Sequence, residues 1–327
     1  MGHSFKTFLK HTAKDFHNQS VNPPVVRAST IIFKSLQDIR KTQNKYKKDP
    51  RGGYFDYGRQ GTSTTHILQK ILTKLEESYH VFLTPTGFGS IFLAILSVVR
   101  PGDEIFVSDP VYSPTRRLTE NFLKDFKIKT IFYNPHDLNT LRKNITKKTK
   151  LIFVESPGSN SFEFQDLSKI ISIAKKRKIF TAIDNTWATP YFFKPMKLGF
   201  DMSIVSATKY YSGHSDVMGG SLAVNKKVFN HVEKTQKIIG LRLGPDDAYL
   251  ITRGLRTLDV RLDKHEENAK KVAAFLSKNK KVKLLYPYLK GSLNYRLWKK
   301  YYSGASGLMG LKIKTKDKKS VVKFVNS

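Results

Sequence analysis

A set of residues that could bind and activate a small molecule follows the short apolar runs of this chain, where strands are expected to end. They are Gly87, Phe88, Tyr112, Asp184, Ser206, Thr208 and Lys209. The set contains a carboxylate, an amine, two hydroxyls, aromatic rings and the glycine-containing start of a helix. If the strands are parallel neighbours, their carboxyl ends meet at one edge of a sheet, and these residues converge there.

Pyridoxal 5′-phosphate (PLP) is a cofactor whose chemistry needs all of these groups. It forms a Schiff base with a lysine amine, for which Lys209 is the candidate, and an anion such as Asp184 keeps its pyridine nitrogen protonated. Its phosphate suits a helix N-terminus with nearby hydroxyl groups, and its flat ring can stack on Tyr112. We therefore interpret the set as a PLP site.

Each of these residues taken alone also has a simpler interpretation. An aspartate after a strand is often a helix cap, and Ser-x-Thr-Lys is often a turn with a surface lysine. Gly87 alone can be a turn residue, and Tyr112 alone can be a packing residue. Because the groups occur together, each at the end of an expected strand, their joint pattern favours the cofactor site.

Short β-branched runs alternate with helical periods through the middle of the chain. Strands are expected at residues 80–83, 104–108, 130–133, 151–154, 180–183 and 202–205. Helices are expected at 62–75, at 87–99, at 167–176 and, as one long helix, at 245–276. This alternation predicts an α/β fold with a mostly parallel sheet.

The chain divides into three expected parts. Residues 1–60 are irregular and predict an N-terminal arm, because they contain Pro23–Pro24 and Gly52–Gly53. Residues 61–250 predict the large cofactor-binding domain. Residues 251–327 predict part of a smaller C-terminal α+β domain, with a strand at 308–313 and a helix at 319–325. We expect this domain to be truncated, because the pattern stops without closing.

The charge of the chain raises a different class of function. The 58 Lys and Arg residues exceed the 26 Asp and Glu residues, which gives a formal net charge of +32 and leaves a polyanion-binding protein as an alternative. The basic clusters adjoin amphipathic or turn-like segments, and no zinc-finger, basic-zipper or RNA-binding signature is present. We therefore expect solvated lysine-rich faces rather than a nucleic-acid partner.

Composition also excludes several kinds of site. There is no Cys, so disulfides, thiolate–metal sites and a cysteine nucleophile are excluded, and no metal site is predicted. The longest apolar run, 91–96, is far short of the roughly 20 residues of a membrane helix. Residues 1–17 lack the apolar segment of a secretory signal. These features predict a cytoplasmic protein without a membrane partner.

Several motifs of the chain resemble the PLP-dependent enzymes of Cys/Met metabolism, and among them the cystathionine β-lyase branch. They are Tyr-Gly-Arg (57–59), Val-Glu-Ser-Pro-Gly-Ser (154–159), Ile-Asp-Asn-Thr-Trp-Ala (183–188), Ser-Ala-Thr-Lys-Tyr-Tyr-Ser-Gly-His-Ser-Asp (206–216), and the stretches 252–262, 297–299 and 304–308. The resemblance implies the aspartate-aminotransferase-like fold (fold type I), with helices on both faces of the sheet.

The resemblance also implies roles for individual residues. Lys209 would bind PLP covalently and later shuttle protons, Asp184 would pair with the pyridine nitrogen, and Tyr112 would stack on the ring and assist proton transfer. The phosphate would be held by the backbone of Gly87 and Phe88 and by the side chains of Ser206 and Thr208.

Two further residues, Tyr57 and Arg59, would reach the phosphate bound to a neighbouring subunit. The active site then needs at least a dimer, and the family usually forms a homotetramer built from two such dimers.

The implied reaction is β-elimination at a carbon–sulfur bond, with cystathionine giving homocysteine, pyruvate and ammonia in methionine biosynthesis. Ser159 stands where γ-acting relatives carry Asn, which favours β-elimination over a cystathionine γ-synthase or γ-lyase. Gln60 stands where β-lyases often carry a second arginine, which leaves a shorter, cysteine-conjugate substrate as an alternative. Relatives continue past the last residue of this chain and bring an arginine of their small domain to the substrate α-carboxylate. None of the arginines after Lys209 stands in a matching context, so we expect slow turnover from this chain.

Overall fold

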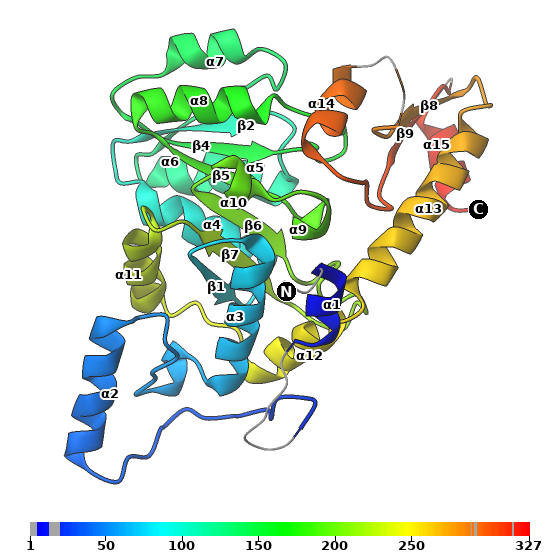
Figure 1. Ribbon diagram of the computed structural model, residues 1–327. Helices are drawn as coiled ribbons and strands as arrows, with labels where there is room; N and C mark the ends of the chain where they lie inside the picture. Colours follow the sequence, from blue (N-terminus) through cyan, green and yellow to red (C-terminus); the bar gives the residue numbers. More distant parts are fainter. Residues whose placement is uncertain (1–4, 13–19, 289, 291–292, 316) are drawn as a thin grey trace.

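The centre of the molecule is a seven-stranded sheet. The computed structural model describes residues 5–12, 20–288, 290, 293–315 and 317–327 of the chain. The strands are β1 (His80–Thr84), β2 (Glu104–Ser108), β3 (Lys129–Tyr133), β4 (Thr149–Glu155), β5 (Phe180–Asp184), β6 (Met202–Ser206) and β7 (Gly220–Val224). Their order is β1-β7-β6-β5-β4-β2-β3 (Figure 1). Strands β3, β2, β4, β5 and β6 are parallel, whereas β7 is antiparallel to both of its neighbours.

All six expected strands are present to within two residues of the predicted bounds. Strand β7 was not among them. Its apolar part, residues 222–224, is short and follows two glycines, so it does not stand out as a strand in the sequence. This antiparallel strand makes the sheet mostly, rather than wholly, parallel, as predicted.

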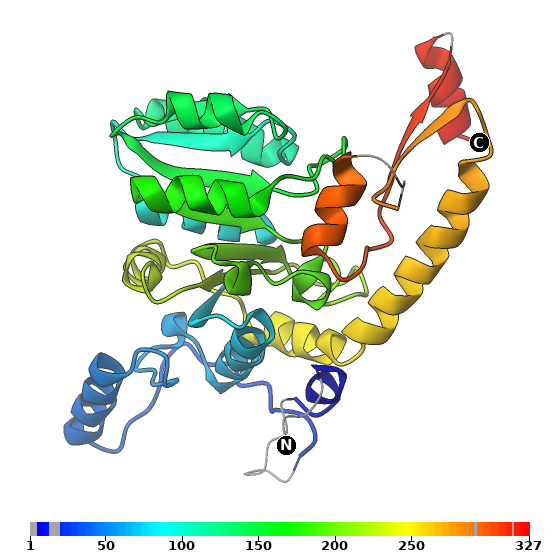
Figure 2. The ribbon, with the colours of Figure 1, turned by 45° about the horizontal axis from the view of Figure 1, so that its top comes forward.

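Helices cover both faces of the sheet (Figures 1 and 2). They are α3 (Ser63–Glu76), α4 (Gly87–Val98), α7 (Leu138–Asn144), α8 (Leu167–Arg177), α11 (Phe229–Ile239) and α12 (Pro245–Leu255). Within β4, Ile152 and Val154 belong to the apolar cluster that includes α3 and α8, while Leu151 and Phe153 belong to the cluster that includes α4 and α11. Successive strand residues therefore face opposite layers of helices. The predicted α/β architecture is confirmed.

Short helical turns make the remaining connections around the sheet. They are η1 (Gly58–Gln60), α5 (Ser113–Arg117), the π-helical turn η2 (Leu118–Phe122), α6 (Leu123–Asp125), α9 (Thr189–Phe192) and α10 (Pro195–Leu198).

The N-terminal segment contains two helices, α1 (Phe5–Lys10) and α2 (Leu36–Lys48). The prediction that residues 1–60 are irregular is therefore wrong for 5–10 and 36–48. Residues 1–4 and 13–19 lie outside the described part. Helix α2 forms because the Ser35 hydroxyl accepts a hydrogen bond from the Asp38 N–H and lysines occupy the last turn. None of its residues is buried, and its contact with α11 is made by Tyr46, whose hydroxyl donates to Glu233 and whose ring lies against the Lys237 ammonium.

The long helix expected over 245–276 is two helices, α12 and α13 (Leu258–Leu276), because Thr257 leaves the helical conformation at a φ of −112° and a ψ of 8°. Helix α13 leads away from the sheet toward the C-terminal elements (Figure 2). These are β8 (Val282–Leu285), α14 (Leu293–Tyr301), β9 (Gly310–Ile313) and α15 (Lys318–Val325), and β8 pairs with β9. The expected strand at 308–313 and helix at 319–325 are present. The domain boundaries at 60 and 250 stay predictions.

No described helix is both long and apolar enough to cross a membrane.

A fully buried carboxyl, Glu76, lies at the end of α3 behind the sheet. Its Oε1 accepts a hydrogen bond from the hydroxyl of Tyr211, which is also fully buried, at 3.3 Å. Its Oε2 has no hydrogen-bond partner among the described residues. Burial raises the pKa of Glu76 to about 8. The folded protein therefore holds this carboxyl in its protonated form near neutral pH.

This burial makes the stability of the protein depend on pH. Between pH 4.5 and pH 8, the folded state keeps a proton on Glu76 that the unfolded chain releases, so the free energy of unfolding falls as pH rises. We expect Glu76→Gln to remove this pH-dependent fall in the free energy of unfolding. Its stability advantage over the wild type should grow with pH and reach the order of a few kcal/mol at pH 8.

Urea unfolding at a series of pH values measures the difference between the two proteins. The control is Asp125→Asn, which changes an exposed carboxyl that forms no ion pair or hydrogen bond with a described residue, and this variant should keep the pH dependence of the wild type. A pH-independent difference for Glu76→Gln would contradict the expectation.

Candidate active site

The carboxyl ends of β1, β2, β4, β5 and β6 lie at one edge of the sheet. Strand β7 is antiparallel to both β1 and β6, so β1 and β6 run in the same direction. The register places Gly220 between Thr84 and Ser206, and it places Glu155 beside Asp184. The edge predicted from the strand ends therefore exists.

Asp184 is joined to Ser206 through one intermediate residue. The N–H of Thr186 donates to Asp184 Oδ1 at 2.9 Å, and the N–H of Ser206 donates to Thr186 Oγ1 at 2.9 Å. Burial raises the pKa of Asp184. Two neighbouring strands thus hold this carboxylate in a fixed orientation within a low-dielectric environment.

A second carboxylate, Glu155, lies next to Asp184 on the adjacent strand. It accepts a hydrogen bond from the Tyr112 N–H at 2.7 Å, and its other oxygen accepts one from the Ser159 hydroxyl. Burial raises the pKa of Glu155, and the charge of Asp184 raises it further. Among the described residues, neither carboxylate forms a salt bridge with a cationic side chain.

The start of α4 lies directly against Ser206. A Cβ at Gly87 would lie 2.5 Å from the Ser206 Cβ and Oγ, so only glycine allows this approach. The Thr86 hydroxyl caps the helix by accepting from the Gly89 N–H. In the described structure, the N–H groups of Gly87 and Phe88 donate to no protein acceptor. They form an anion-binding start of a 12-residue helix.

The turn that carries Lys209 begins immediately after β6. The Lys209 N–H donates to the Ser206 carbonyl at 3.2 Å. The Thr208 hydroxyl donates to the Gly219 carbonyl and accepts from the Gly219 N–H, so it is already engaged within the protein. The Lys209 side chain is exposed and forms no hydrogen bond or ion pair with a described residue. The amine is therefore free to react.

The other aromatic and basic candidates have different positions. Tyr112 lies at the edge beside Glu155, with 46% of its surface exposed. Tyr57 immediately precedes η1 and Arg59 lies on it, where the Arg59 guanidinium donates to the Lys237 carbonyl in α11 at 3.2 Å. In the described part of the chain, Tyr57 and Arg59 form no hydrogen bond or ring contact with the residues at the sheet edge. Their expected role toward a neighbouring subunit stays a prediction.

Two residues of this edge, Glu155 and Thr186, received no role from the sequence. Both lie inside motifs that carried the resemblance. Glu155 ends β4 as Asp184 ends β5, so applying the strand-end rule to every strand would have found it. Thr186 acts through a hydrogen bond across two strands, and no sequence signal marks such a contact.

The residues at this edge fit PLP. A buried Glu155 beside a half-buried Asp184, neither paired with a described cationic side chain, suits a group that brings its own positive charge, as a protonated pyridine nitrogen does. The unpaired N–H groups at the start of α4 suit a phosphate. The amine of Lys209 is exposed and has no hydrogen bond or ion pair with a described side chain that must break before it reacts with an aldehyde.

Comparison with known proteins supports the same assignment. A cystathionine β-lyase from Haemophilus influenzae is 35% identical over 306 residues, which cover 92% of this chain and 76% of that protein. An L-alanine/L-glutamate racemase from Wolbachia pipientis is 36% identical over 299 residues, which cover 89% of this chain and 73% of that protein. The crystal structure of cystathionine γ-synthase from Xanthomonas oryzae matches with a TM-score of 0.90 at 28% identity, over 100% of this chain and 82% of that one.

The structural match confirms the predicted fold type I architecture. A family model described as Cys/Met metabolism PLP-dependent enzyme matches residues 6–327. The chain belongs to this family of PLP-dependent enzymes.

Proposed function

We propose that the protein is a carbon–sulfur β-lyase of the cystathionine β-lyase type. With uptake of one water, it would convert cystathionine to homocysteine, pyruvate and ammonia. The observation that carries the proposal is the carboxyl pair Glu155–Asp184 at the ends of adjacent strands, one strand away from the turn of Lys209. The relatives named cystathionine β-lyase, which match along most of the chain, support the choice of reaction.

Each residue at the edge of the sheet would have one task. When bound, PLP supplies an electron-withdrawing ring that stabilises negative charge at the α-carbon of an amino acid. Asp184 would hold the pyridine nitrogen in its protonated form, and Tyr112 would cover the ring. The amine of Lys209 would take the proton from the α-carbon of the substrate.

The phosphate would be bound by the groups around the start of α4. The N–H groups of Gly87 and Phe88 point outward from the helix N-terminus, and Ser206 adjoins them. Thr208 contributes to this site less directly, because its hydroxyl is held by Gly219.

Two residues, Ser159 and Gln60, provide evidence on which substrate the site accepts. The Ser159 hydroxyl donates to Glu155, which also accepts a hydrogen bond from the Tyr112 N–H. This hydroxyl is therefore engaged within the protein and does not donate to the side chain of a longer substrate. Gln60 donates to Asp56 and supplies no positive charge for a distal carboxylate. A cysteine conjugate therefore remains an alternative substrate beside cystathionine, and γ-elimination is the alternative reaction.

The identity to the L-alanine/L-glutamate racemase supports racemisation as a second candidate function. A racemase also begins by removing the α-proton, so Lys209 and Asp184 could serve that first step, and a second acid would have to supply a proton to the opposite face of the carbon.

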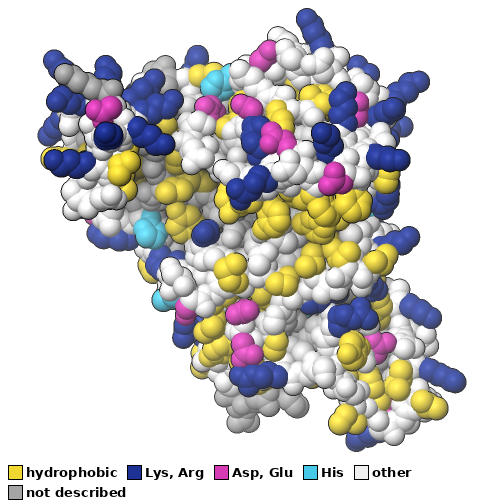
Figure 3. Space-filling model, turned by 180° about the vertical axis from the view of Figure 1, so that it is seen from behind, with side chains coloured by type: hydrophobic (Ala, Val, Ile, Leu, Met, Phe, Trp, Pro, Cys, Tyr) yellow, Lys and Arg dark blue, Asp and Glu magenta, His cyan; other side chains and the backbone are white. Residues whose placement is uncertain are grey.

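We also propose that the protein acts in the cytoplasm as a homotetramer built from dimers that share active sites. The support for the assembly lies on the N-terminal segment and on α2, where Val21, Ile32 and Leu36 are 66%, 92% and 74% exposed. The basic residues do not favour a nucleic-acid partner, because Lys and Arg are spread over the face seen in Figure 3, with apolar side chains between them.

Product analysis separates these reactions. We expect the PLP-loaded protein to release pyruvate from cystathionine and to leave L-alanine and L-glutamate unchanged. Release of 2-oxobutyrate would indicate γ-elimination instead, and formation of D-alanine or D-glutamate would favour the racemase. Pyruvate from a cysteine conjugate but not from cystathionine would identify the shorter substrate.

The role of Lys209 has a spectroscopic test. We expect Lys209→Ala to abolish both the visible absorption of lysine-bound PLP and the release of pyruvate, because no other amine takes its place. The control Lys226→Ala, which changes an exposed lysine in the turn after β7, should keep both. Normal absorption in Lys209→Ala would assign the attachment to another lysine.

Shared active sites have a direct test by subunit mixing. We expect Arg59→Ala and Lys209→Ala each to be inactive, and refolding of an equal mixture to restore about a quarter of the wild-type activity. Half of the random dimers are hybrids, and one of the two sites in each hybrid then has both residues intact. If Arg59 serves the site of its own chain, the mixture stays inactive.

A further inference from the structure

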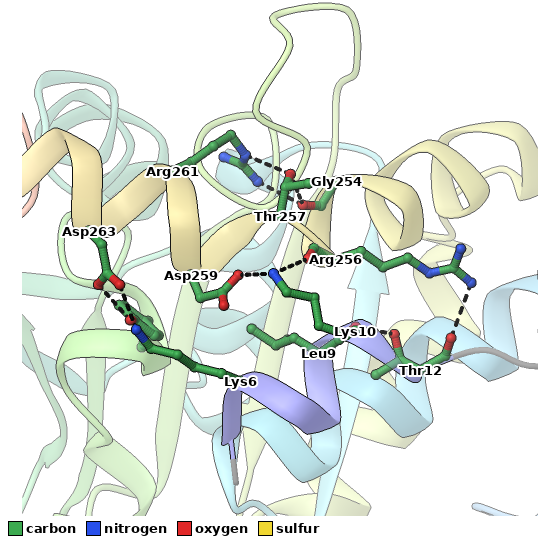
Figure 4. Close-up of polar contacts among 11 residues, drawn as sticks. Lys6, Leu9, Lys10, Thr12, Gly254, Arg256, Thr257, Asp259, Arg261 and Asp263 are labelled. Atoms are coloured by element: carbon green, nitrogen blue, oxygen red, sulfur yellow. Dashed lines mark hydrogen bonds and ion pairs between the residues drawn. The ribbon is translucent and has the colours of Figure 1, made fainter.

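The junction between α12 and α13 lies directly behind the turn of Lys209. Arg261, in the first turn of α13, donates from Nη1 to the carbonyl of Tyr210, the residue after Lys209, at 2.8 Å. The same guanidinium donates from Nη2 to the Gly254 carbonyl at 2.7 Å and from Nε to the Thr257 hydroxyl at 3.0 Å. Figure 4 shows the last two contacts. One side chain thus joins the lysine turn to both helices of the junction.

Two glycines bring the junction this close to the turn. A Cβ at Gly254 would overlap the backbone oxygens of Tyr211 and Ser212, so α12 packs against the turn without any side chain between them. Gly213 ends the turn with a φ of +77°, and a Cβ there would overlap the guanidinium of Arg261. The turn is therefore enclosed by main-chain packing on one side and by a planar cation on the other.

We propose that Arg261 is a positioning residue that holds the backbone of the Lys209 turn in the orientation required to attach PLP. The inference rests on the proposed role of Lys209. Arg261 touches neither cofactor nor substrate in this proposal, and it acts only through the carbonyl of Tyr210.

The geometry calls for arginine at this position. Its rigid planar fork can place three N–H groups on three acceptors that belong to different segments. A lysine ammonium at the end of a flexible chain can reach one or two of these acceptors, but it does not fix their relative orientation. Arg261→Lys should therefore keep part of the orientation of the Lys209 turn, and Arg261→Met should keep none of what Arg261 contributes.

The opposite side of the same junction provides a matched control. Arg256, at the C-terminal end of α12, donates to the Thr12 and Val21 carbonyls and to the Asn22 side chain of the N-terminal segment. Lys10 of α1 donates to the Arg256 carbonyl at 3.1 Å and pairs with Asp259 at 2.7 Å (Figure 4). These contacts stabilise the junction without touching the lysine turn.

The test measures how fast apoprotein attaches added PLP. The amine condenses with the aldehyde of PLP with loss of one water, and the visible absorption of lysine-bound PLP reports the rate. Borohydride reduction followed by peptide mass mapping identifies the lysine. We expect Arg261→Met to slow attachment at Lys209 about tenfold or more, Arg261→Lys to be intermediate, and Arg256→Met to attach PLP at the wild-type rate.

Thermal unfolding of each apoprotein separates positioning from general stability. If Arg261→Met and Arg256→Met lose similar thermal stability and only the former attaches PLP slowly, the positioning role is supported. Attachment at the wild-type rate in folded Arg261→Met, or equal slowing in both variants, overturns it. If Arg261→Met does not fold, Arg261→Lys decides, because a wild-type rate there also overturns the proposal. Failure of the wild type to attach PLP at Lys209 would instead reject the proposed function.

Discussion

The side-by-side placement of two carboxyl groups, a buried Glu155 and a half-buried Asp184, is the constraint on which the arrangement of the site depends. Glu155 and Asp184 end adjacent parallel strands, and burial raises the pKa of both. Buried ionised groups are costly without a partner, and no described cationic side chain pairs with either of them. Neutral hydrogen-bond donors, the N–H groups of Thr186 and Tyr112, compensate for part of this cost. A cationic cofactor would compensate for the rest, so binding and folding would be linked through the same two groups.

The sheet topology places the start of α4 at the same edge as the Glu155–Asp184 pair. Strand β7 reverses direction between β6 and β1, and this reversal places the carboxyl ends of β1 and β6 at the same edge. Helix α4, which follows β1, therefore starts against Ser206 rather than on the opposite side of the molecule. The anion-binding helix start and the carboxylate pair consequently occupy one edge, as a cofactor with a phosphate at one end and a basic nitrogen at the other requires.

The sequence predicts the parts of this site that depend on order along the chain. Asp184, Ser206 and Lys209 each follow an apolar run, so periodicity and the strand-end rule are sufficient to find them. Strand β7 was missed because its apolar part is short and follows two glycines, and the break at Thr257 was missed because the helical pattern resumes directly after it. Helix α2 was missed for a different reason: Ser35 and Asp38 mark its start, but most of its residues are polar, so apolar periodicity does not reveal it. Arg261 could not be found from the sequence, because its role depends on a carbonyl 51 residues earlier in the chain.

The residues after Lys209 are fixed far more firmly than Lys209 itself. The Tyr210 carbonyl is held by Arg261, the Tyr211 hydroxyl is held by Glu76 in α3, and the backbone at Ser212 packs against Gly254. The Lys209 side chain, in contrast, is exposed. An amine that must both bind a cofactor and move a proton needs a fixed attachment point and a mobile end. Three separate helices supply the fixed point, so a change in any of them would alter the reach of the amine without touching it.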